Sequence, residues 1–150
     1  MLGRILPQTI DNAYRGHELA IWLLIAILIL KAATGLTSLF AGRVVALGAH
    51  RVPIGGFPPN AARLLVLVLA RLALATLLLT LFGVLVLIRY RAMIPVTYIL
   101  LLLQHMGGEI LLLKESKITG MSSATVVNTL LLFLSIVGLI ASLYGGSDGA

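Results

Sequence analysis

The sequence predicts an all-α integral membrane protein, folded as an antiparallel bundle of four transmembrane helices. Hydrophobic residues make up 60% of the 150 residues and charged residues only 11%. The mean hydropathy is +1.12, and these values lie outside the range of soluble domains. Four stretches are apolar for ~20 residues each, which is enough for a helix to cross a bilayer. None of them shows the strict alternation that is typical of a membrane-spanning strand.

The four apolar stretches comprise residues 19–40, 64–88, 92–113 and 125–144. Each is predicted to be a helix, because lipid leaves the backbone no partners for hydrogen bonds other than those within its own segment. The second and third stretches are joined by only a few residues around RYRAMIP, so we expect a helical hairpin there. The spans leave little chain for a soluble domain, and residues 1–150 are therefore predicted to form one membrane domain.

The connection between the first and second stretches, residues 41–63, is rich in Gly and Pro. This composition favours an irregular or re-entrant connection at the membrane surface.

Positive charge is in excess, with 11 Lys and Arg residues against 5 Asp and Glu and a formal net charge of +6. In a soluble protein this balance would suggest nucleic acid as a partner. Here most cations flank apolar stretches, so the expected partner is a lipid bilayer with anionic headgroups and not nucleic acid. The cations divide almost evenly between the two sides of the membrane. Arg89 and Arg91, in the short hairpin, favour cytoplasmic termini.

Six polar residues lie inside the apolar stretches and are predicted to form an intramembrane cluster. A charged residue at the centre of a membrane helix costs ~2.5–3.5 kcal/mol, so Lys31 and Arg71 are expected to face inward. His105 and Glu109 are four residues apart and share one helical face. From their positions along the spans, the polar residues fall in one half of the bilayer. The cluster comprises Lys31, Arg71, Gln104, His105, Glu109 and Asn128.

Two interpretations of this cluster stay open. It could be a binding pocket or ion path in which Glu109 is the counter-charge, because ionisable residues inside a membrane often have a functional role. It could instead be an internal network of hydrogen bonds and ion pairs that fixes the register of the helices. Arg71 could also extend its long side chain towards the nearer membrane surface, which would leave Lys31 alone to pair with Glu109.

Two neighbouring glycines, Gly107 and Gly108, precede Glu109 in the third stretch. They could allow a kink that exposes backbone carbonyls to a cavity. They could also let a neighbouring helix approach closely.

Several chemistries find no support in the sequence. The chain has no cysteine, which removes disulfides, thiolate catalysis and iron–sulfur clusters. His105 is the only histidine within an apolar stretch, so haem ligation by two histidines of one chain is not predicted. No set of metal ligands or of nucleophile and base can be argued. We therefore predict no catalytic residue, no metal and no cofactor.

Three segments of the chain resemble a family of small, uncharacterised four-helix inner-membrane proteins of proteobacteria. They are TIDNAYRGHELAIWLL, the FPP at residues 57–59, and RYRAMIP. The resemblance implies a multi-pass protein of the bacterial inner membrane. The architecture is also loosely similar to that of DoxX-type membrane proteins, some of which are linked to quinone or thiol redox chemistry. The absence of cysteine excludes a thiol role here.

The function that we expect is that of a non-enzymatic accessory or scaffold subunit of a larger membrane complex, bound to another membrane protein or to a second copy. The alternative is a carrier of small solutes or lipids, with the polar cluster as its pocket. A third possibility is a quinone-associated redox protein.

Overall fold

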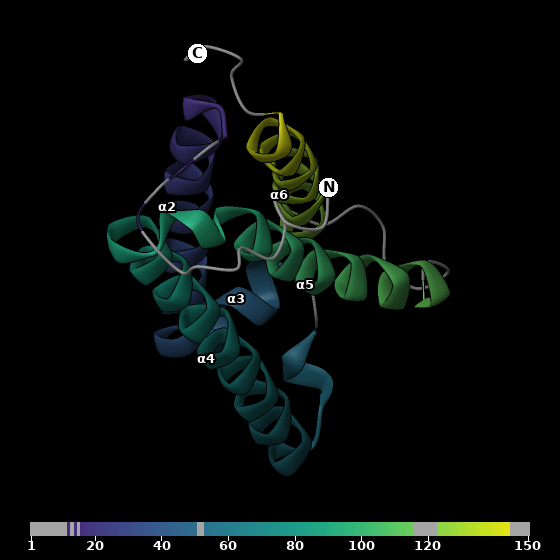
Figure 1. Cartoon of the computed structure of the whole chain (residues 1–150). Coiled ribbons are helices and arrows are strands. Elements are labelled where there is room, and N and C mark those ends of the chain that lie inside the picture. Colours follow the sequence, from purple (N-terminus) through teal and green to yellow (C-terminus); the bar gives the residue numbers. More distant parts are fainter. Residues whose placement is uncertain (1–11, 13, 15, 51–52, 116–122, 145–150) are drawn as a thin grey trace, which may run out of the picture.

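The computed structural model describes residues 12, 14, 16–50, 53–115 and 123–144, with the backbone alone at 108, 109 and 111–115. The regular elements of this described part are all helical, which shows the all-α fold class. Helices occupy all four predicted stretches (Figure 1). The elements are α2 (Glu18–Phe40), α3 (Gly42–Gly48), η1 (Ile54–Gly56), α4 (Pro59–Arg89), η2 (Arg91–Met93), α5 (Ile94–Glu115) and α6 (Ser123–Leu143).

Three of these helices, α2, α4 and α6, are long and apolar enough to cross a membrane. This agrees with an integral membrane protein. The third predicted stretch forms α5, a helix of 22 residues. In Figure 1, α5 runs across α2 at a steep angle and not alongside it. The antiparallel four-helix bundle therefore stays a prediction.

The connection between α2 and α4 is more regular than its composition predicts. Residues GRVVALG form the short helix α3, and η1 follows after Pro53. The helix α4 begins at Pro59, five residues before the predicted start at residue 64. Proline suits the first turn of a helix, because the amide hydrogen that it lacks would have no partner within the helix there.

The helix α2 has the central position, since it packs against both α4 and α6. Its buried residues recur at intervals of three, four and seven residues, which defines one continuous face of a helix. This buried face comprises Ala20, Leu24, Ile27, Leu28, Lys31 and Gly35. Lys31 is the only charged residue among them and lies in the middle of an apolar packing face.

Glycines bring α2 and α4 close together. A Cβ atom at Gly83 of α4 would lie 2.6 Å from Cδ2 of Leu28, and one at Gly35 of α2 would lie 2.9 Å from Cδ2 of Leu77. Both distances are too short for a real side-chain contact. Small residues are the usual means by which membrane helices approach each other. The face of α4 that carries Gly83 therefore lies close against α2.

The helix α6 buries one face, with Leu131, Ser135, Gly138 and Ser142. The two serines donate hydrogen bonds to carbonyl oxygens of their own helix, from Ser135 to Leu131 and from Ser142 to Leu139, each at 2.7 Å. Their hydroxyl groups are therefore satisfied within α6, and their small volume is what the packing uses.

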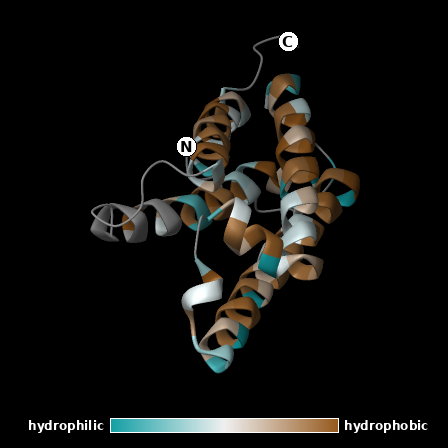
Figure 2. Cartoon of the chain, turned by 180° about the vertical axis from the view of Figure 1, so that it is seen from behind, coloured by the Kyte–Doolittle hydropathy of each residue, from teal (hydrophilic) through white to brown (hydrophobic). Residues whose placement is uncertain are grey.

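The outer surfaces of the long helices are apolar. Figure 2 shows hydrophobic residues over most of their length, while hydrophilic positions gather near the beginning of α4. Many large aliphatic and aromatic side chains are exposed, among them Trp22, Leu81 and Phe133. In a soluble protein such surfaces would aggregate, whereas in a bilayer they contact lipid.

Candidate functional site

The side chain of Lys31 is buried, with 4% of its surface exposed. It belongs to the face of α2 that packs inward, four residues before Gly35. Its Nζ atom lies 3.4 Å from Nε2 of His105 on α5. His105 is equally buried, with 3% of its surface exposed. The structure therefore joins two residues that are 74 positions apart in the sequence.

The other ring nitrogen of His105 contacts α6. Nδ1 of His105 lies 2.7 Å from Oδ1 of Asn128. An amide oxygen can only accept a hydrogen bond, so Nδ1 donates to it, and in the neutral ring Nε2 then carries the lone pair. That lone pair faces the Lys31 ammonium, which has only donors. The two contacts are thus consistent with each other, and we call these residues the Lys31–His105–Asn128 chain.

The contact with Lys31 is compatible with a neutral imidazole. A protonated His105 would place a second positive charge 3.4 Å from Nζ of Lys31 in a buried position, and two like charges repel strongly where water is excluded. The imidazole accepts from the ammonium and donates to the amide, so it transmits one polar connection from α2 through α5 to α6. Each of these helices contributes one polar side chain.

Gln104, next to His105 in the sequence, faces a different neighbour. Its Nε2 atom donates to Oγ1 of Thr76 on α4 at 3.0 Å, and Thr76 in turn donates to the carbonyl oxygen of Leu72 at 3.0 Å. The Oε1 atom of Gln104 is buried and accepts no hydrogen bond within the described residues. An unsatisfied buried oxygen costs about 1–3 kcal/mol. Gln104 therefore links α5 to α4, separately from the Lys31–His105–Asn128 chain.

Arg71 does not join these residues, and the expectation that it faces inward is wrong. Its side chain is exposed on α4. The residue is separated from buried Thr80 by nine positions, or about two and a half turns, which places the two on opposite sides of the helix. The close approach of α4 to α2 at Gly83 selects the face that carries Thr80. Arg71 is consequently turned outward.

Glu109 lies in α5, but its side chain is outside the described part of the structure. The predicted pairing of Glu109 with Lys31 stays a prediction for that reason. At Gly107 the helix continues without a break, and a Cβ atom there would meet nothing within 4 Å. Among the described residues, Gly107 is therefore not a point of close helix approach, and the predicted kink stays a prediction.

Two residues of this region were not singled out from the sequence, namely Thr76 and Tyr98. Tyr98 is fully buried and donates a hydrogen bond from its hydroxyl to the carbonyl oxygen of Ala20 at 2.6 Å. Tyr98, Leu101 and His105 are buried and recur at i, i+3 and i+7 on α5. This spacing could have revealed the shared face. No local signal marks Thr76, because its role depends on the rotation of α4.

Among the described side chains, no three His, Asp or Glu residues gather in a way that could hold a metal ion. The site places a buried cation, an imidazole and an amide in contact, one after the other. This arrangement can hold a proton or a polar group between three helices.

Comparison with known proteins finds no matching family model, no matching curated protein and no matching solved structure.

Proposed function

We propose that this protein is an accessory subunit of a membrane complex and that the outward face of α4 around Arg71 contacts a helix of another membrane protein. The proposed setting is the bacterial inner membrane, with α5 as a fourth membrane segment and with cytoplasmic termini, as the sequence predicts. A composition of 60% hydrophobic residues supports a role within the bilayer.

The exposure of Arg71 carries this proposal. Its neighbours on the same face of α4 are aliphatic and exposed, with 53% of Leu67, 45% of Val68 and 51% of Leu74 accessible. An arginine on a surface that meets only lipid costs ~2.5–3.5 kcal/mol near the centre of a span. Lys31 avoids a similar cost because His105 accepts from it. Arg71 has no such partner within the described residues.

A partner with an acidic side chain at the same depth would remove this cost. A guanidinium and a carboxylate form two parallel hydrogen bonds, and they do so best where water is excluded. The surrounding leucines would supply the packing surface. We propose a different protein as the partner and not a second copy, because α4 itself has no acidic residue to offer the Arg71 of another copy.

Native mass spectrometry of the protein released from its own membrane in mild detergent tests the proposal. Wild-type protein should carry a second protein of defined mass. The Arg71→Leu variant keeps the apolar surface but removes the charge, and it should lose that protein. Arg89→Leu, at the C-terminal end of α4, is the matched control and should retain the second protein. If the Arg71→Leu variant keeps the second protein, the proposal is wrong, and Arg71 only extends its side chain to the membrane surface.

The Lys31–His105–Asn128 chain supports a second candidate, a carrier of small polar solutes. The observation in its favour is a buried cation next to an imidazole, together with the buried oxygen of Gln104 that accepts no hydrogen bond within the described residues. A carrier should lose uptake of its solute in the His105→Phe variant, whereas an accessory subunit should keep its complex. Reconstitution in liposomes separates the two.

A further inference from the structure

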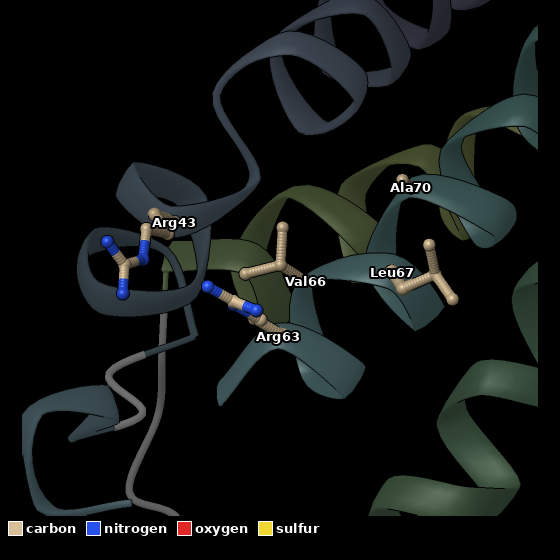
Figure 3. A pocket seen from close by; sticks show the side chains of 5 residues that line it. All are labelled: Arg43, Arg63, Val66, Leu67 and Ala70. Atoms are coloured by element: carbon tan, nitrogen blue, oxygen red, sulfur yellow. The ribbon is translucent and has the colours of Figure 1, made fainter. Parts of the chain in front are cut away.

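A second polar feature lies at the N-terminal end of α4, away from the hairpin. It is separate from the Lys31–His105–Asn128 chain. It is a shallow groove of about 430 Å³ between α3 and α4, lined by Arg43, Arg63, Val66, Leu67 and Ala70. Figure 3 shows the two guanidinium groups close together at one end, with the apolar side chains following along α4. We call it the two-arginine groove.

The sequence builds this groove through small residues. A Cβ atom at Gly42 would lie 3.3 Å from Cγ1 of Val66, so α3 can rest directly on α4. Buried Ala46, Ile54 and Ala62 form a small apolar cluster that holds α3 and η1 against the first turns of α4. This packing fixes the backbone of Arg43 beside that of Arg63. The packing of α3 on α4 therefore brings the two arginines to the same groove.

The charge of the groove is not balanced. None of its five lining residues is acidic, and the described part of the chain gives neither guanidinium a hydrogen bond or an ion pair. Two arginines in this position attract an anion, and a phosphate can accept paired hydrogen bonds from each guanidinium.

The apolar part of the groove points to an amphiphile. Arg63, Val66, Leu67 and Ala70 stand at i, i+3, i+4 and i+7, so they form one strip along α4. The helix has 31 residues and a length of about 46 Å, which exceeds the ~30 Å of the hydrocarbon core. Arg63 lies within the first turns of α4 and thus near headgroup depth. The strip leads from there towards the centre of the span.

We propose that the two-arginine groove binds one anionic phospholipid, with its phosphate between Arg43 and Arg63 and an acyl chain along Val66, Leu67 and Ala70. This site differs from general attraction to a charged bilayer, because it requires both the pair of arginines and the apolar strip. It shares Leu67 with the proposed contact at Arg71, but its phosphate site at Arg43 and Arg63 is separate from that contact.

Binding of phosphatidylglycerol to the full chain in mild detergent, followed by native mass spectrometry, tests this proposal. Wild-type protein should retain one phosphatidylglycerol in preference to phosphatidylcholine. The Arg43→Gln/Arg63→Gln variant should retain about tenfold less. The Arg89→Gln/Arg91→Gln variant removes the same charge from the opposite end of α4 and should bind as wild type. The helical signal in the circular dichroism spectrum verifies that each variant is folded.

Three results would overturn the proposal. The first is equal loss of lipid in both double variants, which would mean that net charge alone attracts it. The second is equal retention of phosphatidylglycerol and phosphatidylcholine by the wild type. The third is displacement of the lipid by glycerol phosphate at the same concentration as by lysophosphatidylglycerol, which would mean that the apolar strip contributes nothing.

Discussion

The ring of Tyr98 on α5 occupies the space that a side chain at Gly138 of α6 would need. A Cβ atom at Gly138 would clash with three atoms of the tyrosine ring, Cε1, Cζ and Oη. Gly138 is buried, and the ring is held in place because its hydroxyl donates to the carbonyl oxygen of Ala20 on α2. One tyrosine thus connects three helices, and it can do so only where α6 lacks a side chain.

The Gly138→Ala variant should lose about 1–3 kcal/mol of its free energy of unfolding, because a rigid ring cannot move aside as a flexible chain can. Denaturant unfolding in mild detergent measures this. Gly107→Ala is the matched control within a helix, since a Cβ atom there would meet nothing within 4 Å among the described residues. That control should be neutral or slightly stabilising. Equal losses in the two variants would show that the tyrosine contact is unimportant.

The Tyr98→Phe variant should lose about 1 kcal/mol, since it keeps the ring but removes the hydrogen bond to Ala20. The same unfolding measurement applies. Tyr144 is 75% exposed, so Tyr144→Phe should leave the free energy of unfolding unchanged. If the Tyr98→Phe variant has the same free energy of unfolding as the wild type, this hydrogen bond contributes nothing to stability.

The contact between Lys31 and His105 should appear as coupling between their substitutions. His105→Leu leaves a buried ammonium without its acceptor and should cost about 3 kcal/mol. In the Lys31→Met background the same change should cost only about 1 kcal/mol, since no charge is left unpaired. The coupling of about 2 kcal/mol is the difference between these values.

Gln104→Leu serves as the control for this cycle. Gln104 is adjacent in the sequence but faces Thr76 on α4, so its cost should be the same with and without Lys31→Met. Additivity of Lys31→Met and His105→Leu would instead show that the two side chains do not interact in the membrane.

Stability should fall at high pH because of Tyr14, which lies before α2. Burial raises the pKa of Tyr14 from 10.0 to about 12, and its hydroxyl donates to the carbonyl oxygen of His17 at 3.1 Å. Between these pH values the unfolded tyrosine has lost its proton while the folded one keeps it. Unfolding is therefore increasingly favoured as the pH rises from 10 to 12.

Thermal unfolding at a series of pH values measures this effect. Tyr14→Phe should show a smaller loss of stability across that interval than the wild type, whereas the exposed Tyr144→Phe should behave as the wild type does. An unchanged pH profile in Tyr14→Phe would assign the loss to other groups.

The sequence by itself determined the helices and their apolar character. The three stretches that form α2, α4 and α6 are long and hydrophobic enough that a helix satisfies their backbone in lipid, whatever its rotation. It also identified Lys31 as a residue that needs a buried partner, because the cost of an unpaired charge does not depend on the fold.

Only the tertiary structure decided which polar residues meet. In a membrane protein both the lipid-facing and the buried sides of a helix are apolar, so hydrophobicity does not reveal rotation. Rotation is set by contacts such as those of Gly83 with Leu28, which turn Thr80 inward and Arg71 outward. These contacts join residues far apart in the sequence, and so the partners of Lys31 and Gln104 could not be read from spacing along one helix.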